Sequence, residues 1–266
     1  MRGMTAVAVG LFAASTVLAQ PAGVTKDEVK CESGTGKALS KFVGSKSKCA
    51  SKCFVAARKT SGPYTGCFGP AYPDPATNTC IMDSLKGAEA KARASIVKAC
   101  TKDCPECYGP TTCSTGEPFV GTTEGLVDLQ GPNVYCLENM GTTPSKTEAK
   151  CEDGLAKSLS KFVGSKSKCY DKCNQNVFKA KIPEGSCDPP SPTDPATQTC
   201  IAKAETKNTQ LIDKVCFTPP ATPPACYDGS AFRPNSGAGW TSLVEGIIDT
   251  QIPTIACGSP SAAFVD

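Results

Sequence analysis

The sequence predicts a mainly α-helical fold built from two tandem homologous modules, each a disulfide-stapled antiparallel helical hairpin with an irregular C-terminal extension. A cysteine pattern that occurs twice, 120 residues apart, is the first observation behind this prediction. The eleven residues from Leu39 to Cys49 also recur unchanged from Leu159 to Cys169. Finally, apolar residues in the first half of each copy recur every three or four positions, which is typical of one helix face. The repeated cysteines are Cys31, Cys49, Cys53, Cys67 and Cys80, then Cys151, Cys169, Cys173, Cys187 and Cys200.

The N-terminus predicts export. Arg2 is the only charged residue before Lys26, and an apolar stretch follows it and ends in Val-Leu-Ala at Ala19. A charged start, an apolar stretch and a small-residue cleavage site are typical of a secretory signal peptide. We therefore expect residues 1–19 to be removed and the mature chain to be secreted or periplasmic, where cysteines oxidise to disulfides.

The copies divide the mature chain into residues 25–136 and 148–257. A linker of residues 137–147 separates them and a tail of residues 258–266 follows. The alignment extends to Glu124–Gln130 with Glu245–Gln251 and to Cys136 with Cys257. Each copy has eight shared cysteines, and the first adds Cys104 and Cys113, so both counts are even. Even counts favour pairing within each copy.

Each module begins with a long amphipathic helix. Its apolar face carries Leu39, Phe42, Lys46, Cys49 and Cys53 in the first copy. The face in the second copy carries Cys151, Leu155, Leu159, Phe162, Lys166, Cys169, Cys173 and Val177. Gly44 and Gly164 each weaken this helix by about 1 kcal/mol.

A second helix follows a loop rich in proline and glycine. Asp74-Pro75 and Asp194-Pro195 supply an N-cap and a first-turn proline. Helical spacing then predicts helices over Cys80–Cys100 and Cys200–Cys216.

Disulfides between the two helices should form the rungs of the hairpin. Cys31 and Cys49 are 18 residues apart and Cys80 and Cys100 are 20 apart, spans of about 27 and 30 Å in a helix. Exchange of Cys49 with Cys53 is the main competing arrangement, since eight cysteines allow 105 connectivities. The predicted pairs are Cys31–Cys100, Cys49–Cys80, Cys53–Cys67, Cys104–Cys113, Cys107–Cys136, Cys151–Cys216, Cys169–Cys200, Cys173–Cys187 and Cys226–Cys257.

The last third of each module is predicted to be less regular. Glu124–Gln130 and Glu245–Gln251 are expected to form one or two helical turns, ended by Pro132 and Pro253. Within these turns Glu124 and Asp128, and Glu245 and Asp249, are spaced to face the same way.

Lysines on the first helix of each module form the candidate ligand surface. Such a surface suits an anionic polymer such as an acidic polysaccharide or a cell-surface component, and two copies would add avidity. The competing interpretation is an ordinary solvated helix face. The candidate residues are Lys41, Lys48, Lys52, Lys161, Lys168 and Lys172.

Two other function classes are alternatives. Reduced Cys-x3-Cys pairs such as Cys49 and Cys53 can bind copper or zinc. The Glu124/Asp128 and Glu245/Asp249 pairs can act as acid and base in a polysaccharide hydrolase. The Cys-x-x-Cys at Cys104 and Cys107 fits a structural disulfide better than a redox centre, since no strand–helix alternation surrounds it.

Composition excludes several chemistries. The chain has no histidine, which rules out Ser/His/Asp catalysis and attachment of haem c. The formal net charge of +3 argues against general nucleic-acid binding. We predict no cofactor, no metal site, no catalytic residue and no membrane span in the mature chain.

The motif from Lys41 to Cys49, followed by Asp74-Pro75-Ala76-Thr77, resembles a group of exported Cys/Lys-rich repeat proteins of deltaproteobacterial and related environmental bacteria. The resemblance covers nearly the whole mature chain. It implies no particular activity and transfers no catalytic residue. The predicted function is therefore a secreted, non-enzymatic binding or structural module of the cell envelope or extracellular space.

Overall fold

A computed structural model describes residues 25–60, 66–68, 72–136 and 144–257. The predicted signal peptide, the tail and most of the linker lie outside these residues. The described residues contain helices and no strand, apart from one isolated bridge, so the prediction of a mainly α-helical fold is confirmed. The α-helices are α1 (Lys26–Thr60), α2 (Pro75–Met82), α3 (Ala88–Ala99), α4 (Gly109–Thr115), α5 (Glu117–Val134), α6 (Lys146–Phe178), α7 (Pro195–Ile212) and α8 (Gly237–Ile255).

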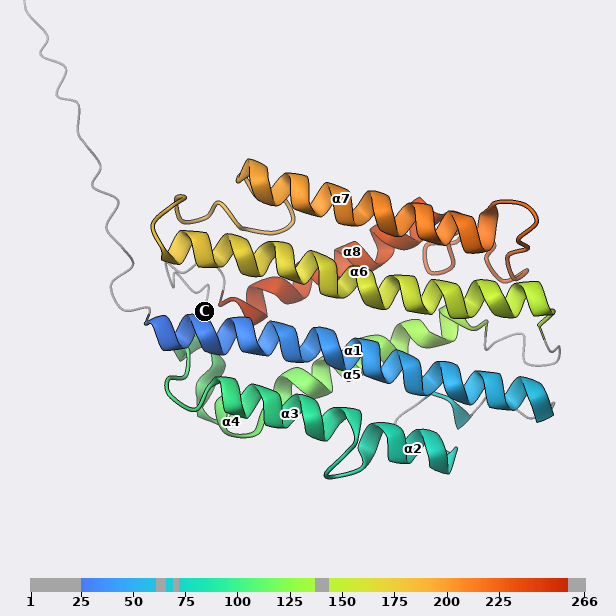
Figure 1. Ribbon diagram of the computed structural model, residues 1–266, viewed down its shortest axis with the longest axis horizontal. Coiled ribbons are helices and arrows are strands. Elements are labelled where there is room, and N and C mark those ends of the chain that lie inside the picture. The colour runs from blue at the N-terminus through green and yellow to red at the C-terminus, as the bar shows by residue number, and fades with distance from the viewer. Residues whose placement is uncertain (1–24, 61–65, 69–71, 137–143, 258–266) are drawn as a thin grey trace, which may run out of the picture.

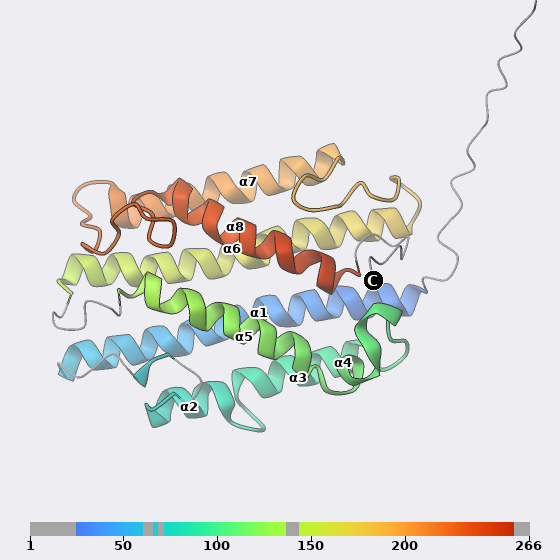
Figure 2. The same ribbon diagram turned by 180° about the vertical axis from the view of Figure 1, so that it is seen from behind.

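The two long helices, α1 and α6, lie side by side in the middle of the molecule and run in opposite directions (Figure 1). Helices α2 and α3 flank α1 on one side, and α7 flanks α6 on the other. Helices α5 and α8 cross the two long helices on the face turned away from the viewer in Figure 1, which is the near face in Figure 2. Each long helix therefore packs against the other long helix, against the helices that flank it and against the helices that cross the pair.

Disulfides connect each long helix to its flanking helices. Cys31 pairs with Cys100 and Cys49 with Cys80, at Cα–Cα distances of 4.4 and 6.0 Å. Because the pairing order is reversed along the chain, α1 is antiparallel to α2 and α3. The second copy has Cys151–Cys216 and Cys169–Cys200 in the same arrangement, at 4.7 and 5.8 Å.

The loop after each long helix is closed by a disulfide of 14-residue separation. These are Cys53–Cys67 and Cys173–Cys187. The competing exchange of Cys49 with Cys53 is therefore wrong. With Cys104–Cys113, the structure contains seven of the nine predicted disulfides.

The second helix of the first copy differs from its prediction. A continuous helix over Cys80–Cys100 was expected, but α2 ends at Met82 and α3 begins at Ala88. The rung cysteines are 20 residues apart here and 16 apart in the second copy. Since the rungs hold both ends of the segment, the four additional residues form a loop. The second copy keeps one α-helix to Ile212, followed by a short π-helical segment, η4 (Asp213–Phe217).

The predicted pairs Cys107–Cys136 and Cys226–Cys257 are wrong. The structure has Cys107–Cys257 and Cys136–Cys226, at Cα–Cα distances of 5.8 and 5.9 Å, so both bonds join one copy to the other. Helix length explains the exchange. Helix α5 has 18 residues and α8 has 19, and each spans about 27–29 Å. Each helix therefore ends far from the cysteine that precedes it in its own copy.

Pro132 and Pro253 do not end their helices as predicted. Each helix continues for two residues beyond its proline, to Val134 and Ile255. The next backbone hydrogen bonds still form, with the amide of Tyr135 donating to Gly131 and the amide of Ala256 donating to Ile252.

Aromatic residues reinforce the exchanged disulfides. Tyr227, next to Cys226, donates a 2.6 Å hydrogen bond to the carbonyl of Val134 at the end of α5. The aligned Tyr108 donates in the same way to the carbonyl of Ile255 at the end of α8. Tyr135 stacks on Phe54 of α1 with ring centroids 3.9 Å apart. These contacts hold α5 and α8 against the long helices.

Candidate functional site

Each long helix buries one lysine on its apolar face. Lys46 of α1 and Lys166 of α6 have no exposed side-chain surface. Each lies at a position of the apolar helix face where an apolar residue is expected. The disulfides and the neighbouring helices cover this face. A buried ammonium needs carboxylates and further hydrogen bonds around it.

Lys46 receives both carboxylates that the sequence analysis singled out in the first copy. Its Nζ lies 2.8 Å from Oε1 of Glu124 and 2.8 Å from Oδ2 of Asp128. The Tyr72 hydroxyl donates to Oε1 of Glu124 at 2.7 Å. Glu124 and Asp128 are therefore not a solvated helix face.

Lys166 has the same surroundings in the second copy. Its Nζ lies 2.7 Å from Oδ1 of Asp249 and also bonds Glu245. The Tyr170 hydroxyl donates to Asp249 at 3.2 Å. The sequence pattern places both lysines on the apolar stripe and each carboxylate pair on one helix face, but it does not show that the lysines and the carboxylates meet. A lysine at an apolar position of both copies was the available signal.

A second glutamate joins each cluster. Burial, followed by the neighbouring Glu124 carboxylate, raises the pKa of Glu89 to about 7. The hydrogen bond that protonated Glu205 donates to Glu245, followed by burial, raises the pKa of Glu205, which aligns with Glu89, to about 7. Burial opposes ionisation of Glu124, but hydrogen bonds from Lys46 and Tyr72 keep its pKa below the ordinary value. Below about pH 7 each cluster therefore holds one proton between two glutamates.

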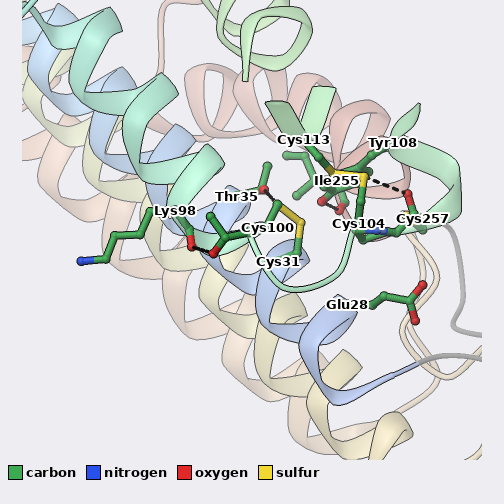
Figure 3. Close-up of a disulfide and its surroundings, with 12 residues drawn as sticks. Glu28, Cys31, Thr35, Lys98, Cys100, Cys104, Tyr108, Cys113, Ile255 and Cys257 are labelled. Carbon is green, nitrogen blue, oxygen red and sulfur yellow. Dashed lines mark hydrogen bonds between the residues drawn. A yellow bond between two sulfur atoms is a disulfide. The ribbon is translucent and has the colours of Figure 1, made fainter. Parts of the chain in front are cut away.

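The sulfur atoms are engaged in disulfides. Cys49 and Cys53 belong to different bonds, as do Cys104 and Cys107. The sulfurs of Cys31, Cys100 and Cys113 lie within 4.8 Å of one another. They belong to two adjacent disulfides, Cys31–Cys100 and Cys104–Cys113 (Figure 3). Thiolates, the form in which cysteine binds metals, are therefore not present in this cluster.

A surface groove of about 470 Å³ is lined by α1, α6, α7 and the end of α8. We call it the lysine groove, and its basic residues are Lys37, Lys41, Lys161, Lys168 and Lys207. The volume lies within the range of about 300–1,000 Å³ typical of small-molecule sites. Serine and amide side chains such as Ser165 and Asn174 supply further hydrogen-bonding groups.

Two carboxylates also line the lysine groove. Asp171 lies 3.6 Å from Lys37 and forms an ion pair that connects α6 to α1. Burial, with the nearby Glu28 carboxylate second, raises the pKa of Glu32 to about 8. At neutral pH Glu32 is therefore mostly uncharged, which leaves the lysines in excess.

The predicted lysine surface is divided by the groove. All six predicted lysines are exposed, but only Lys41, Lys161 and Lys168 line the groove. Lys48, Lys52 and Lys172 lie outside its lining. Lys207 was not predicted because it belongs to α7, and nothing local in the sequence relates α7 to α1.

The comparisons with known proteins found no relative. No protein-family model, no curated protein and no solved structure matches this chain. Among the described helices, none combines the length and the apolar character needed to cross a membrane. The function is therefore argued from the groove and the buried clusters.

Proposed function

We propose that this protein is an exported, non-enzymatic binding module whose ligand is anionic and is held in the lysine groove. The observation that carries this proposal is the convergence of five lysines from three helices on one cavity of about 470 Å³. Opposing acidic charge is limited to Asp171, which is paired with Lys37, and Glu32, whose pKa is raised to about 8. An anionic glycan of the cell envelope or extracellular space fits this charge pattern.

The remaining features form the scaffold in this proposal. The chain is taken as two homologous helical-hairpin modules, exported with cleavage near Ala19 and related to the Cys/Lys-rich repeat proteins that its motif resembles. Nine disulfides with no free cysteine suit an oxidising compartment. The disulfides hold α1 and α6 in place, so the groove is preorganised for binding.

A non-enzymatic role agrees with the state of the carboxylates. Glu124 and Asp128 are both bonded to Lys46, and neither lines the lysine groove. The hydrolase alternative would need these carboxylates to reach a substrate. The soft-metal alternative would need disulfides such as Cys49–Cys80 and Cys53–Cys67 to be reduced first.

Retention on immobilised polygalacturonate tests the proposed function. Changing Lys41, Lys161 and Lys168 to glutamate should abolish retention at low salt, because it converts the groove from basic to acidic. Changing Lys48, Lys52 and Lys172 to glutamate is the matched control, since it makes the same charge change outside the groove. Equal losses in the two triple variants would show that net charge, rather than the groove, governs retention, and the proposal would be wrong.

A further inference from the structure

A second cavity lies behind the lysine groove. It has a volume of about 150 Å³ and is lined by α1, α5, α6 and α8. Its walls are mainly aliphatic, and include Val43, Leu126, Val127, Val163, Ile247 and Ile248. We call it the apolar cavity. Several residues of its lining are partly exposed to solvent, among them Val43, Val163, Leu126 and Ile247.

The apolar cavity lies where the two copies of the sequence pattern meet. Its lining contains aligned positions from both copies, such as Val43 with Val163 and Leu126 with Ile247. Neither copy alone encloses the space. The cavity is therefore a product of the packing of α1 and α5 against α6 and α8.

The two cavities share one wall. Gly36, Ser40, Ser167, Ile252 and Ile255 line both the lysine groove and the apolar cavity. Three of these residues have small side chains, so little side-chain volume separates the two spaces. A Cβ added at Gly36 would lie 3.7 Å from Cγ2 of Ile255, an ordinary contact distance, so a side chain larger than alanine would extend into this junction.

We propose that the lysine groove and the apolar cavity together bind an anionic amphiphile with a single alkyl chain. The anionic head lies among Lys41, Lys161 and Lys168, and the first part of the chain passes Ser40 and Ser167 into the apolar cavity. An apolar cavity of about 150 Å³ accepts a group the size of benzene, so it takes about six carbons. This assignment rests on the proposed function for the charged head and adds the chemical class of the ligand.

The two halves of the site differ in chemistry, since one is basic and the other is aliphatic. The lysines attract a carboxylate or phosphate group, but such a group gains nothing from contact with an aliphatic wall. The aliphatic wall gains from each buried methylene group, which increases affinity roughly fourfold. A soluble glycan satisfies the first requirement only.

Calorimetric titration of the disulfide-intact protein with sodium acetate, butanoate, hexanoate, octanoate and decanoate tests the proposal. Affinity should rise roughly fourfold per methylene up to about six chain carbons and then level off as the cavity fills. Octanol, which lacks the charge, should bind at least tenfold more weakly than octanoate. Affinity that is independent of chain length would overturn the proposal.

Two variants that change the volume of the apolar cavity in opposite directions test whether the alkyl chain of the ligand lies there. Val163→Phe reduces the apolar cavity and should move the levelling point to shorter acids, whereas Leu126→Ala enlarges it and should move the point to longer acids. Misfolding cannot move the point in both directions. An unchanged levelling point in both variants would place the chain elsewhere and overturn the proposal, and the wild-type series remains a test if either variant fails to fold.

The result separates this inference from the proposed function. Loss of octanoate binding in the groove triple variant, with the Lys48/Lys52/Lys172 control unaffected, supports both. Retention on polygalacturonate together with no dependence on chain length supports the proposed function and overturns the amphiphile. If affinity depends on chain length but is the same in the groove triple variant as in the wild type, the lysines do not bind the head group. That result would overturn the assignment of an anionic head to the lysine groove.

Discussion

At the scale of single residues, the buried lysines show how a charge is accommodated inside a helical protein. Lys46 and Lys166 are surrounded by equivalent carboxylates but by different tyrosines. Tyr72 precedes α2, whereas Tyr170 lies on α6 itself, and each bonds the carboxylates of its cluster. In both copies a tyrosine hydroxyl donates to a carboxylate of the cluster, although the tyrosine comes from a different part of the chain.

Lys46→Met should destabilise the protein by about 3 kcal/mol, because it leaves two partly buried carboxylates without their cation. Chemical denaturation with the disulfides intact measures the change. Lys48→Met, at an exposed position of the same helix, should stay within about 0.5 kcal/mol of the wild type. Adding Glu124→Gln and Asp128→Asn to Lys46→Met should recover much of the loss. Similar values for the two single variants would contradict the assigned role of Lys46.

The raised carboxyl pKa values predict that stability falls as pH rises from about 4.5 to about 7. Glu89 and Glu205 have an ordinary pKa of 4.5 and a folded pKa of about 7. Between these values the folded state binds more protons than the unfolded state, so raising the pH favours unfolding. Glu152, buried beside Arg58, adds to the trend with a folded pKa of about 7.

The lowered pKa values of Glu124 and Glu245 have the opposite effect below about pH 4.5, where protonation removes their contribution. The melting temperature should therefore be highest near pH 5, which thermal unfolding across pH 3–8 measures. The double variant Glu89→Gln and Glu205→Gln should flatten the decline above pH 5. A melting temperature that rises steadily from pH 5 to pH 8 would contradict the prediction.

At the scale of the helices, the break between α2 and α3 combines a constraint from the disulfides with local bonds, since Asp83 accepts the amides of Leu85 and Lys86. The segment Asp83–Gly87 loops out because the rungs Cys49–Cys80 and Cys31–Cys100 hold its two sides. Gly87 closes this loop. A Cβ at Gly87 would lie 2.5 Å from the carbonyl oxygens of Asp83 and Ile81.

Gly87→Ala should destabilise the protein by about 1–3 kcal/mol, because backbone atoms must move to accept the methyl group. Gly44→Ala is the matched comparison, since nothing lies within 4 Å of the added Cβ in the interior of α1. That change should stabilise by about 0.5–1 kcal/mol through helix propensity. Thermal unfolding of both variants measures whether each change raises or lowers the stability of the protein. A change in the same direction for both variants would show that the contacts around Gly87 are unimportant.

At the scale of the whole molecule, the exchanged disulfides make the two copies one covalent unit. Cys107–Cys257 and Cys136–Cys226 fasten the C-terminal part of each copy to the other. The lysine groove and the apolar cavity both take their walls from the two copies. Binding at either is therefore a property of the complete chain.

Cleavage at a protease site inserted into the linker of residues 137–147 should not separate the halves. Without reductant, the cut protein should migrate as one species because two disulfides cross between the halves. Reductant should release two fragments. Separation before reduction would show that the pairing is Cys107–Cys136 and Cys226–Cys257. The positive control for separation is a variant in which serine replaces all four cysteines, Cys107, Cys136, Cys226 and Cys257.

Short-range chemistry made much of this architecture predictable. Apolar spacing of three and four residues predicted the helices around Phe42 and Phe162, because side-chain period depends on local geometry alone. Asp74-Pro75 and Asp194-Pro195 predicted where two helices begin. The side chain of each aspartate accepts a hydrogen bond from the backbone amide of the third residue of its helix. Spacing along the antiparallel helices was enough to indicate the rungs, because helix rise converts sequence separation into distance.

The sequence by itself therefore determined the two long helices, the rungs and the duplicated cysteine pattern. Only the tertiary structure decided which copy each C-terminal cysteine joins, since Cys136 and Cys257 have the same local pattern and either pairing satisfies it. The contact of Lys46 with Glu124, 78 residues away, and the lysine groove also depend on how α5 and α8 cross the antiparallel pair of α1 and α6. Packing between elements is set by the fit of whole surfaces, and no local repeat of residues encodes that fit.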